Sequence, residues 1–238
     1  MLWSKAWLET RVRFLICLIG ITALCGYNVF RMDTGLTSPV NLGYYYSVLH
    51  SSHSQLVMMW ILAVNFVTMG GLLREKAVGA ASFSLALPFS RLHLMCVRIS
   101  VSLVQSIALI VIPWTAMFLM GSVVGKTHSI SQALFHVVLL VGGGTVLYAI
   151  ALLTSSLVEG EYTAPMVSFG ILVLVVSQLD SPSLRAFSPL HLMAGSKYYN
   201  THSGLLVGPV PWVPIAAFAL VAALLVALSV KAIQMREF

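Results

Sequence analysis

Charged residues are scarce in this sequence. Only 8% of its 238 residues are Asp, Glu, Lys or Arg, whereas 59% are hydrophobic, and the mean hydropathy is +0.95. A soluble domain carries about 25% charged residues. So few charges cannot cover a water-facing surface, and the composition therefore predicts a polytopic membrane protein. The net charge of +6 then bears on membrane orientation, and we expect no nucleic-acid partner.

Cysteine is equally scarce. Cys17, Cys25 and Cys96 are odd in number and have no C-x-x-C spacing, which argues against a disulfide framework or a structural zinc site. We interpret all three as small core residues.

Six stretches are apolar enough to cross a bilayer. A hydrocarbon core about 30 Å thick needs about 20 mostly apolar residues in a helix. Such stretches cover residues 14–32, 54–73, 93–121, 131–157, 162–179 and 212–231. Because lipid cannot satisfy open backbone polar groups, all are expected to be helices. The prediction is an all-α protein with one transmembrane domain over 1–238, in which Pro113 kinks or breaks the third span.

The distribution of basic residues predicts the orientation. With the N-terminus in the cytoplasm, nine Lys and Arg residues are cytoplasmic: Lys5, Arg11, Arg13, Arg74, Lys76, Arg91, Arg98, Lys231 and Arg236. Four are external: Arg31, Lys126, Arg185 and Lys197. Cytoplasmic loops of membrane proteins are enriched in Lys and Arg. We therefore expect both termini in the cytoplasm, as an even number of spans requires.

Two segments on the cytoplasmic side have apolar residues that a water-exposed loop does not need. Residues 1–13 place Trp3 and Trp7 on one helix face, which favours an amphipathic helix in the membrane interface. Within residues 74–92, the stretch from Glu75 to Leu87 contains good helix formers with Phe83, Leu85 and Leu87, and Pro88 ends it. A solvated loop that only fixes topology is the alternative. The apolar residues favour a short helix that docks a cytoplasmic partner.

The largest external loop, 180–211, is also more apolar than an aqueous loop requires. Leu190, Leu192 and Met193 favour a re-entrant or interfacial element that caps the bundle. An ordinary interfacial loop with Tyr198 and Tyr199 at headgroup level is the alternative.

The spans lack the chemistry of an ion-coupled carrier. Away from their ends they hold no Asp, Glu, Lys or Arg, and the larger polar groups are Asn65, Gln105, His136 and Gln178. Secondary transporters and pumps place ionisable groups near the midplane. "GSVVGKT" at 121–127 is one residue too short for a phosphate-binding loop. If this protein drives transport, the energy is expected to come from another subunit.

Four histidines fall in predicted external loops: His50, His53, His128 and His202. The spacing of the first two suits a shared metal-ligand face, but no cysteine and few carboxylates accompany them. We favour interfacial histidines over a metal site. Gly142, Gly143 and Gly144 form a small-residue face that serves either packing within the chain or a dimer seam.

The segment after the second span resembles the membrane subunits of ABC-2 type transporters, the type V exporter-like permeases. That family has an acidic residue, a glycine, a Leu-rich helix and a Leu-Pro-x-Ser-Arg ending between spans two and three. The matching residues here are Glu75, Gly79, Leu85, Leu87, Pro88, Ser90 and Arg91. The external Ser188, Pro189 and His191 look like the Ser-Pro element of the family between its last two spans. Six spans, the amphipathic N-terminal helix and cytoplasmic termini also match.

The resemblance implies a permease that is not itself an enzyme. Such permeases pair as dimers, and each docks a separate ATP-binding cassette subunit that binds ATP and magnesium, so that no cofactor is expected in this chain. The N-terminal helix, with Trp3 and Trp7, and the 74–92 helix would form the docking surface. Phe83 and Leu87 would be its buried anchor.

In the same resemblance Glu75 and Arg91 would make polar contacts to the cassette. The implied location is the cytoplasmic membrane of a prokaryote, and the implied activity is export of a hydrophobic or amphipathic substrate.

Two other functions remain open from the sequence. One is a scaffold or sensor subunit that uses the same fold without transporting anything. The other is a membrane enzyme that uses the external histidines. The sequence specifies neither the substrate nor whether the partner permease is identical.

Overall fold

The protein is all-helical over the residues that the structure describes. This structure, a computed structural model, describes residues 2–35, 41–68, 91–123, 130–158, 163–179, 187–198 and 208–235. Its helices are α1 (Leu2–Gly35), α2 (Asn41–Thr68), α5 (Arg91–Val123), α6 (Ile130–Leu157), α7 (Thr163–Leu179), α8 (Pro189–Ala194), the 3-10 helix η2 (Ser196–Tyr198) and α9 (Trp212–Gln234).

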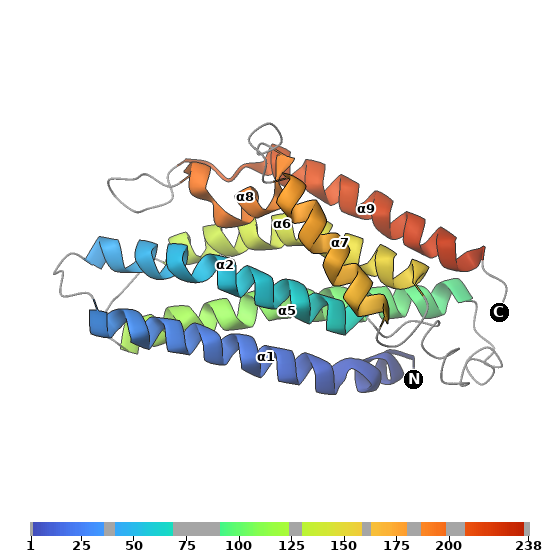
Figure 1. The fold of residues 1–238 in the computed structure, drawn as a ribbon, viewed down its shortest axis with the longest axis horizontal. Coiled ribbons are helices and arrows are strands. Elements are labelled where there is room, and N and C mark those ends of the chain that lie inside the picture. The colour runs from blue at the N-terminus through green and yellow to red at the C-terminus, as the bar shows by residue number, and fades with distance from the viewer. Residues whose placement is uncertain are drawn as a thin grey trace.

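The long helices form an elongated bundle in which successive helices run in opposite directions. Helices α1, α2, α5 and α6 lie along its long axis, α7 crosses obliquely, and α9 returns along the far side (Figure 1). The start of α1 and the end of α9 lie toward the same end of the bundle (Figure 1). An even number of crossings would place them in this way.

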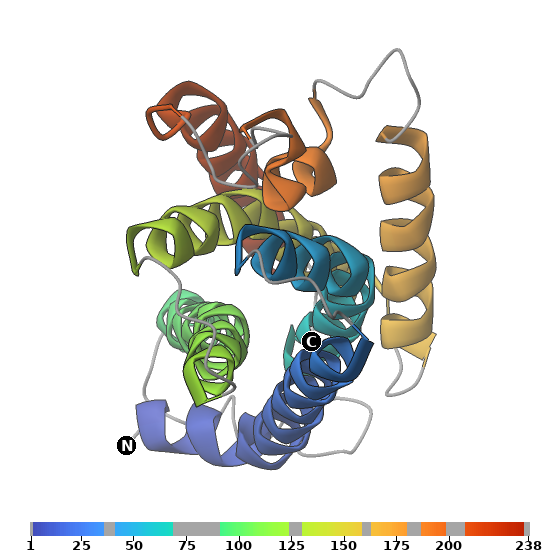
Figure 2. The ribbon, with the colours of Figure 1, turned by 90° about the vertical axis from the view of Figure 1, so that its left-hand side faces the viewer.

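Helix α6 is the centre of the bundle. It contacts α2, α5, α7, α8 and α9, and in the end-on view it lies between α9 and α8 on one side and α2 and α5 on the other (Figure 2). Half of its residues are buried. The main apolar core surrounds it and includes Trp60, Leu109, Leu147 and Met193. The hydroxyl of Thr154 also donates to Ser168 Oγ over 2.6 Å, which holds α6 against α7.

Consecutive glycines let three neighbours approach α6 closely. A β-carbon at Gly142 would lie 3.0 Å from Ile215, one at Gly143 would lie 2.5 Å from Met193, and one at Gly144 would lie 2.9 Å from Trp60. Lipid supplies no hydrophobic force between helices, so close packing through small residues is what stabilises such a bundle. Of the two roles open for these glycines, packing within the chain is the one observed.

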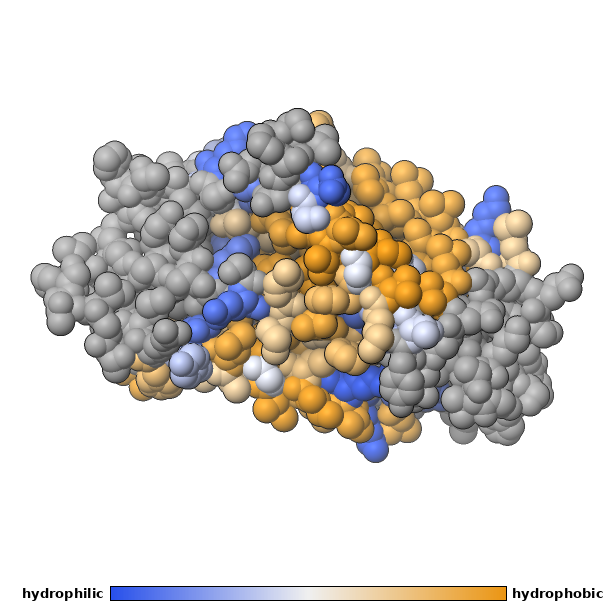
Figure 3. Space-filling model, in the orientation of Figure 1, coloured by the Kyte–Doolittle hydropathy of each residue, from blue (hydrophilic) through white to orange (hydrophobic). Residues whose placement is uncertain are grey.

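In the described part of the chain, four helical segments are long and apolar enough to cross a membrane: Leu2–Phe30, Leu92–Val123, Ile130–Leu157 and Trp212–Gln234. Gln55–Thr68 and Pro165–Leu179 are apolar but shorter. Helix α9 is mostly exposed along its apolar length, and hydrophobic residues cover the middle of the face drawn in Figure 3. A multi-pass helical membrane protein is the class that these features define.

Two helices differ from the expected boundaries. Helix α2 begins at Asn41 rather than at residue 54, so His50 and His53, expected in an external loop, lie within a helix. Helix α5 continues through Pro113, which therefore does not break it. Pro113 has no N–H to offer the Leu109 carbonyl one turn earlier, and burial of Leu109 and Trp114 in the core holds the helix together on both sides.

The expected interfacial helix over 1–13 and the span after it form one unbroken helix, α1. Its first turns, however, run across the direction of the rest of the helix (Figure 2). At roughly 50 Å, a helix of 34 residues is much longer than a bilayer core of about 30 Å. The change of direction thus separates an end segment from a segment of spanning length.

Candidate functional site

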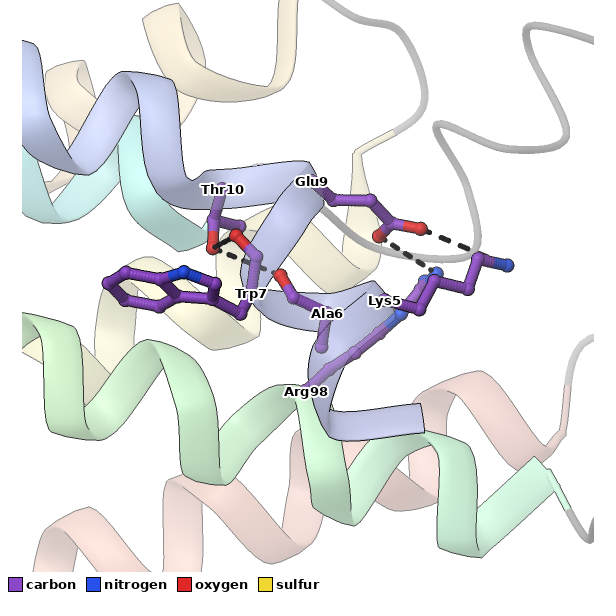
Figure 4. Close-up of polar contacts among 6 residues, drawn as sticks. All are labelled: Lys5, Ala6, Trp7, Glu9, Thr10 and Arg98. Carbon is purple, nitrogen blue, oxygen red and sulfur yellow. Dashed lines mark hydrogen bonds and ion pairs between the residues drawn. The ribbon is translucent and has the colours of Figure 1, made fainter. Parts of the chain in front are cut away.

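The change of direction in α1 lies next to Thr10. The Thr10 hydroxyl donates to the Ala6 carbonyl over 3.1 Å, one turn earlier in the same helix, and lies 3.5 Å from the Trp7 carbonyl. Hydroxyl groups that bond back to their own helix in this way often bend it. Figure 4 shows the ribbon turning between Ala6 and Thr10. This contact lies where the first turns of α1 change direction (Figure 4).

Glu9 joins these first turns to α5. Its carboxylate lies 3.3 Å from the Arg98 guanidinium and 3.8 Å from the Lys5 ammonium group, each through a different oxygen (Figure 4). The Arg98 side chain is only 18% exposed and the Glu9 side chain 30%. An ion pair this well shielded is screened less by salt than a surface pair.

A second link uses the residue directly after Glu9. The Gln105 amide nitrogen donates to the Thr10 hydroxyl oxygen over 2.8 Å, and Gln105 is almost completely buried. Because a buried amide group is costly when unpaired, this bond specifies how α1 and α5 fit together. One ion pair and one hydrogen bond therefore hold the first turns of α1 against α5.

Buried hydroxyl groups continue this polar seam into the bundle. Ser102 and the Tyr148 hydroxyl group lie 2.7 Å apart, and the Trp60 indole nitrogen donates to the Ser106 carbonyl over 3.1 Å. These contacts join α5 to α6 and to α2. Asn65, also on α2, is buried and donates to the Ile61 carbonyl over 2.7 Å.

The predicted docking residues are described only in part. Trp3 and Trp7 are 55% and 42% exposed, and Trp7 packs against Phe14 with ring centroids 5.6 Å apart. Arg91 is the first residue of α5. The other docking candidates lie outside the described residues: Glu75, Gly79, Phe83, Leu85, Leu87 and Pro88. Their assignment stays a prediction.

The segment predicted to be external contains a short packed helix, α8. Ser188 and Pro189 are buried at the start of α8, and Met193 is buried against α6. His191 is half-buried in the last turn. Gly195 closes this short helix with a positive φ of 65°, a conformation that glycine adopts at no steric cost. Of the two alternatives for this segment, the described part agrees with an element packed onto the bundle.

Two histidines come together inside the bundle. His136 is fully buried, stacks on Trp114 with ring centroids 4.5 Å apart, and lies 6.2 Å from His53. His53, Trp114 and Cys25 line an apolar cavity between α1, α2, α5, α6 and α8. Within the described ranges, no three His, Cys, Asp or Glu side chains are grouped so that they could hold a metal ion.

The sequence contained a signal for the α1–α5 link that we did not use. Glu9 and Arg98 have opposite charges. Glu9 precedes the first predicted span, and Arg98 lies near the start of the third, on the same predicted side of the membrane. Thr10 directly follows Glu9, and Gln105 lies two turns after Arg98. Polar residues at matched depth on two apolar helices are candidates for contact.

The chain matches no family model, no curated protein and no solved structure.

Proposed function

We propose that this chain is the permease subunit of an ATP-driven transporter of the ABC-2 type. In this proposal it lies in the cytoplasmic membrane of a prokaryote, crosses it six times, and pairs with a second permease chain. A separate ATP-binding cassette subunit docks on its cytoplasmic side and binds ATP and magnesium. The cargo is hydrophobic or amphipathic and is exported.

The link between α1 and α5 is the observation that carries this proposal. The predicted docking helix, 74–92, leads directly into α5, and the exposed Trp3 and Trp7 lie on the first turns of α1. The Glu9–Arg98 pair and the Gln105–Thr10 hydrogen bond connect these two elements. A cassette that binds both elements would move them as one body.

Such a connection has a mechanical consequence. Binding and hydrolysis of ATP can shift a permease only through different affinities of the cassette for two arrangements of the helices. A docking surface joined to α1 and α5 by buried polar contacts transmits that difference to two long helices. A flexible docking surface would not transmit this difference in affinity to the helices.

The test is to purify the tagged chain from its native membrane in mild detergent and to identify the proteins that accompany it. We expect a soluble subunit with a phosphate-binding loop in fixed stoichiometry, and ATPase activity in the complex. A chain that purifies alone, without ATPase activity, would contradict the proposal.

A variant pair tests the docking residues. Phe83→Ser with Leu87→Ser should abolish cassette binding and leave membrane insertion intact, because neither residue belongs to a predicted span. Phe187→Ser is the matched control, since Phe187 is 68% exposed and lies on the predicted external side. Full cassette binding by the double variant would show that the docking assignment is wrong.

A further inference from the structure

An apolar cavity lies inside the bundle, between α1, α2, α5, α6 and α8. It holds about 390 Å³ of space free of protein atoms, its open mouth included. The described residues that line it include no Asp, Glu, Lys or Arg, and most of them are aliphatic. The others are Cys25, His53, Trp60, Trp114 and Met193. Ligand sites in proteins combine a space of this size with mainly apolar walls.

The cavity lies at the depth of the hydrocarbon core. Helix α5 has 33 residues, so it is roughly 50 Å long and extends past a bilayer core by about 10 Å at each end if it is centred. Trp114 and Leu109 lie nine and fourteen residues before Val123, the last residue of α5, which is about 14 and 21 Å from that end. Both cavity residues are therefore in the hydrocarbon, on the predicted external side of the midplane. A ligand that reaches them through the membrane must be uncharged, because a charge is costly at that depth.

The Trp60 indole is held in place without a ligand. Its N–H donates to the Ser106 carbonyl over 3.1 Å, and Ser106 does not line the cavity. At the other end of the ring system, Trp60 Cη2 lies 2.9 Å from where a β-carbon of Gly144 would be, so this part of the indole packs against the backbone of α6. The nitrogen already has its acceptor, and the indole therefore offers a ligand an apolar aromatic surface.

A second aromatic contact holds Trp114. Its ring stacks on the buried His136, with ring centroids 4.5 Å apart and 20° between the planes. Because His136 is not part of the cavity lining, a ligand can reach Trp114 only at its other face or at its edges. Aromatic rings attract one another both in offset stacks and edge to face. Two aromatic walls that are ordered before binding lower the entropy cost of binding an aromatic ligand.

Two sulfur atoms belong to the same lining. Met193 is buried and packs against Gly143, and Cys25 is almost completely buried. Sulfur makes favourable contacts with aromatic rings at about 5 Å, often at the ring edge. A saturated ligand of the same size would lack both the ring–ring and the sulfur–ring contacts.

We propose that this cavity binds a small, uncharged aromatic molecule of one ring. The ring contacts Trp60, Trp114 and the Met193 sulfur, and the aliphatic side chains of the lining exclude water. An apolar cavity of about 150 Å³ is large enough to bind benzene, and the space here, with its mouth, leaves room for a short substituent as well. The site is formed by one chain, so it depends neither on a cassette subunit nor on a second permease.

Photolabelling of the chain in lipid nanodiscs tests the site. On irradiation a phenyl diazirine loses nitrogen and inserts into nearby bonds, and mass spectrometry of the peptides locates the adducts. We expect adducts on the cavity lining that saturating toluene prevents. Leu220 and Leu224 are the internal control, since both are well exposed on α9 and should be labelled from the bilayer whether or not toluene is present. Adducts at such exposed positions alone would overturn the proposal.

Methylcyclohexane distinguishes an aromatic site from a merely apolar one. It has the carbon skeleton of toluene without the aromatic ring. Toluene should prevent the cavity adducts at about two- to tenfold lower concentration in the membrane, as the additional attraction between aromatic rings predicts. Equal competition by the two compounds would contradict an aromatic ligand.

Two variants change the cavity in opposite directions. Val57→Phe fills it and should abolish the toluene-sensitive adducts, whereas Leu140→Ala enlarges it and should let naphthalene, with two rings, compete at lower concentration than in the unaltered chain. Their controls are Val104→Phe and Leu119→Ala, because Val104 and Leu119 are well exposed and do not line the cavity. Leu140→Ala keeps the test valid if Val57→Phe does not fold. Labelling and competition unchanged in both cavity variants, or changed equally in the controls, would show that the ligand binds elsewhere.

Discussion

At the scale of single residues, Gly143 leaves the least room for a side chain among the glycines of the described helices. A β-carbon there would lie 2.5 Å from Met193 Cγ and 2.6 Å from the Pro189 carbonyl oxygen. The second contact is with backbone, which cannot rotate away as a side chain can. The packing of α8 onto α6 therefore depends on the absence of a side chain at this position.

Gly143→Ala should lower the free energy of unfolding by about 1–3 kcal/mol, because overpacking forces a backbone shift. Gly170→Ala is the matched control: Gly170 is also helical, and a β-carbon there meets nothing within 4 Å. That variant should be neutral or more stable by up to about 1 kcal/mol, since alanine is the better helix former. Thermal unfolding of both variants in the same detergent measures the difference. Equal midpoints would show that α8 does not pack on Gly143.

At the scale of elements, the contact between α1 and α5 combines an ion pair, Glu9–Arg98, with a buried hydrogen bond. Thr10 accepts a hydrogen bond from Gln105 while its own hydroxyl group donates to Ala6. One side chain thus both directs the bend in α1 and receives the buried amide of α5. A substitution at Thr10 should therefore affect both the bend in α1 and the hydrogen bond to α5.

Thr10→Val should destabilise the protein by about 1–3 kcal/mol, because it leaves the buried Gln105 amide without an acceptor. The double variant Thr10→Val with Gln105→Met should be more stable than Thr10→Val alone, since replacing both partners by apolar groups removes the unpaired donor. A double-mutant cycle on thermal unfolding gives the coupling energy. Additive effects would mean that the two side chains do not interact.

The predictability of these elements from the sequence follows from their chemistry. The span boundaries at 131–157, 162–179 and 212–231 lie close to those of α6, α7 and α9, because a long apolar run has few alternatives in lipid. The start of α2 was wrong by thirteen residues: its first turns are rich in tyrosine, serine and histidine, and hydropathy marks the part in contact with lipid rather than the whole helix.

At the scale of the whole molecule, the orientation of the bundle determines which of its two ends faces the cytoplasm. The start of α1 and the end of α9 lie toward one end, and the end of α5 toward the other (Figure 1). The excess of Lys and Arg on the first of these ends predicts that it faces the cytoplasm.

Cysteine labelling in intact cells measures this orientation. In a background without Cys17, Cys25 and Cys96, Val123→Cys should react with a membrane-impermeant maleimide, and Met235→Cys should react only after permeabilisation. Both positions are well exposed, at 82% and 75%, so that a lack of labelling reports sidedness and not burial. The reverse pattern would invert the proposed orientation and place the α1–α5 link outside the cell.

The sequence by itself determined that the chain is helical and membrane-embedded, because so few charges leave lipid as the only suitable surroundings and lipid requires helices. It also favoured an element that caps the bundle near Leu190 and left an ordinary interfacial loop as the alternative, because that segment is too apolar for an aqueous loop. Only the tertiary structure decided which polar residues meet. Glu9 and Arg98 are 89 residues apart, and Thr10 and Gln105 are 95 apart. Such pairs depend on how the helices are arranged in space, which the hydropathy of each helix does not specify.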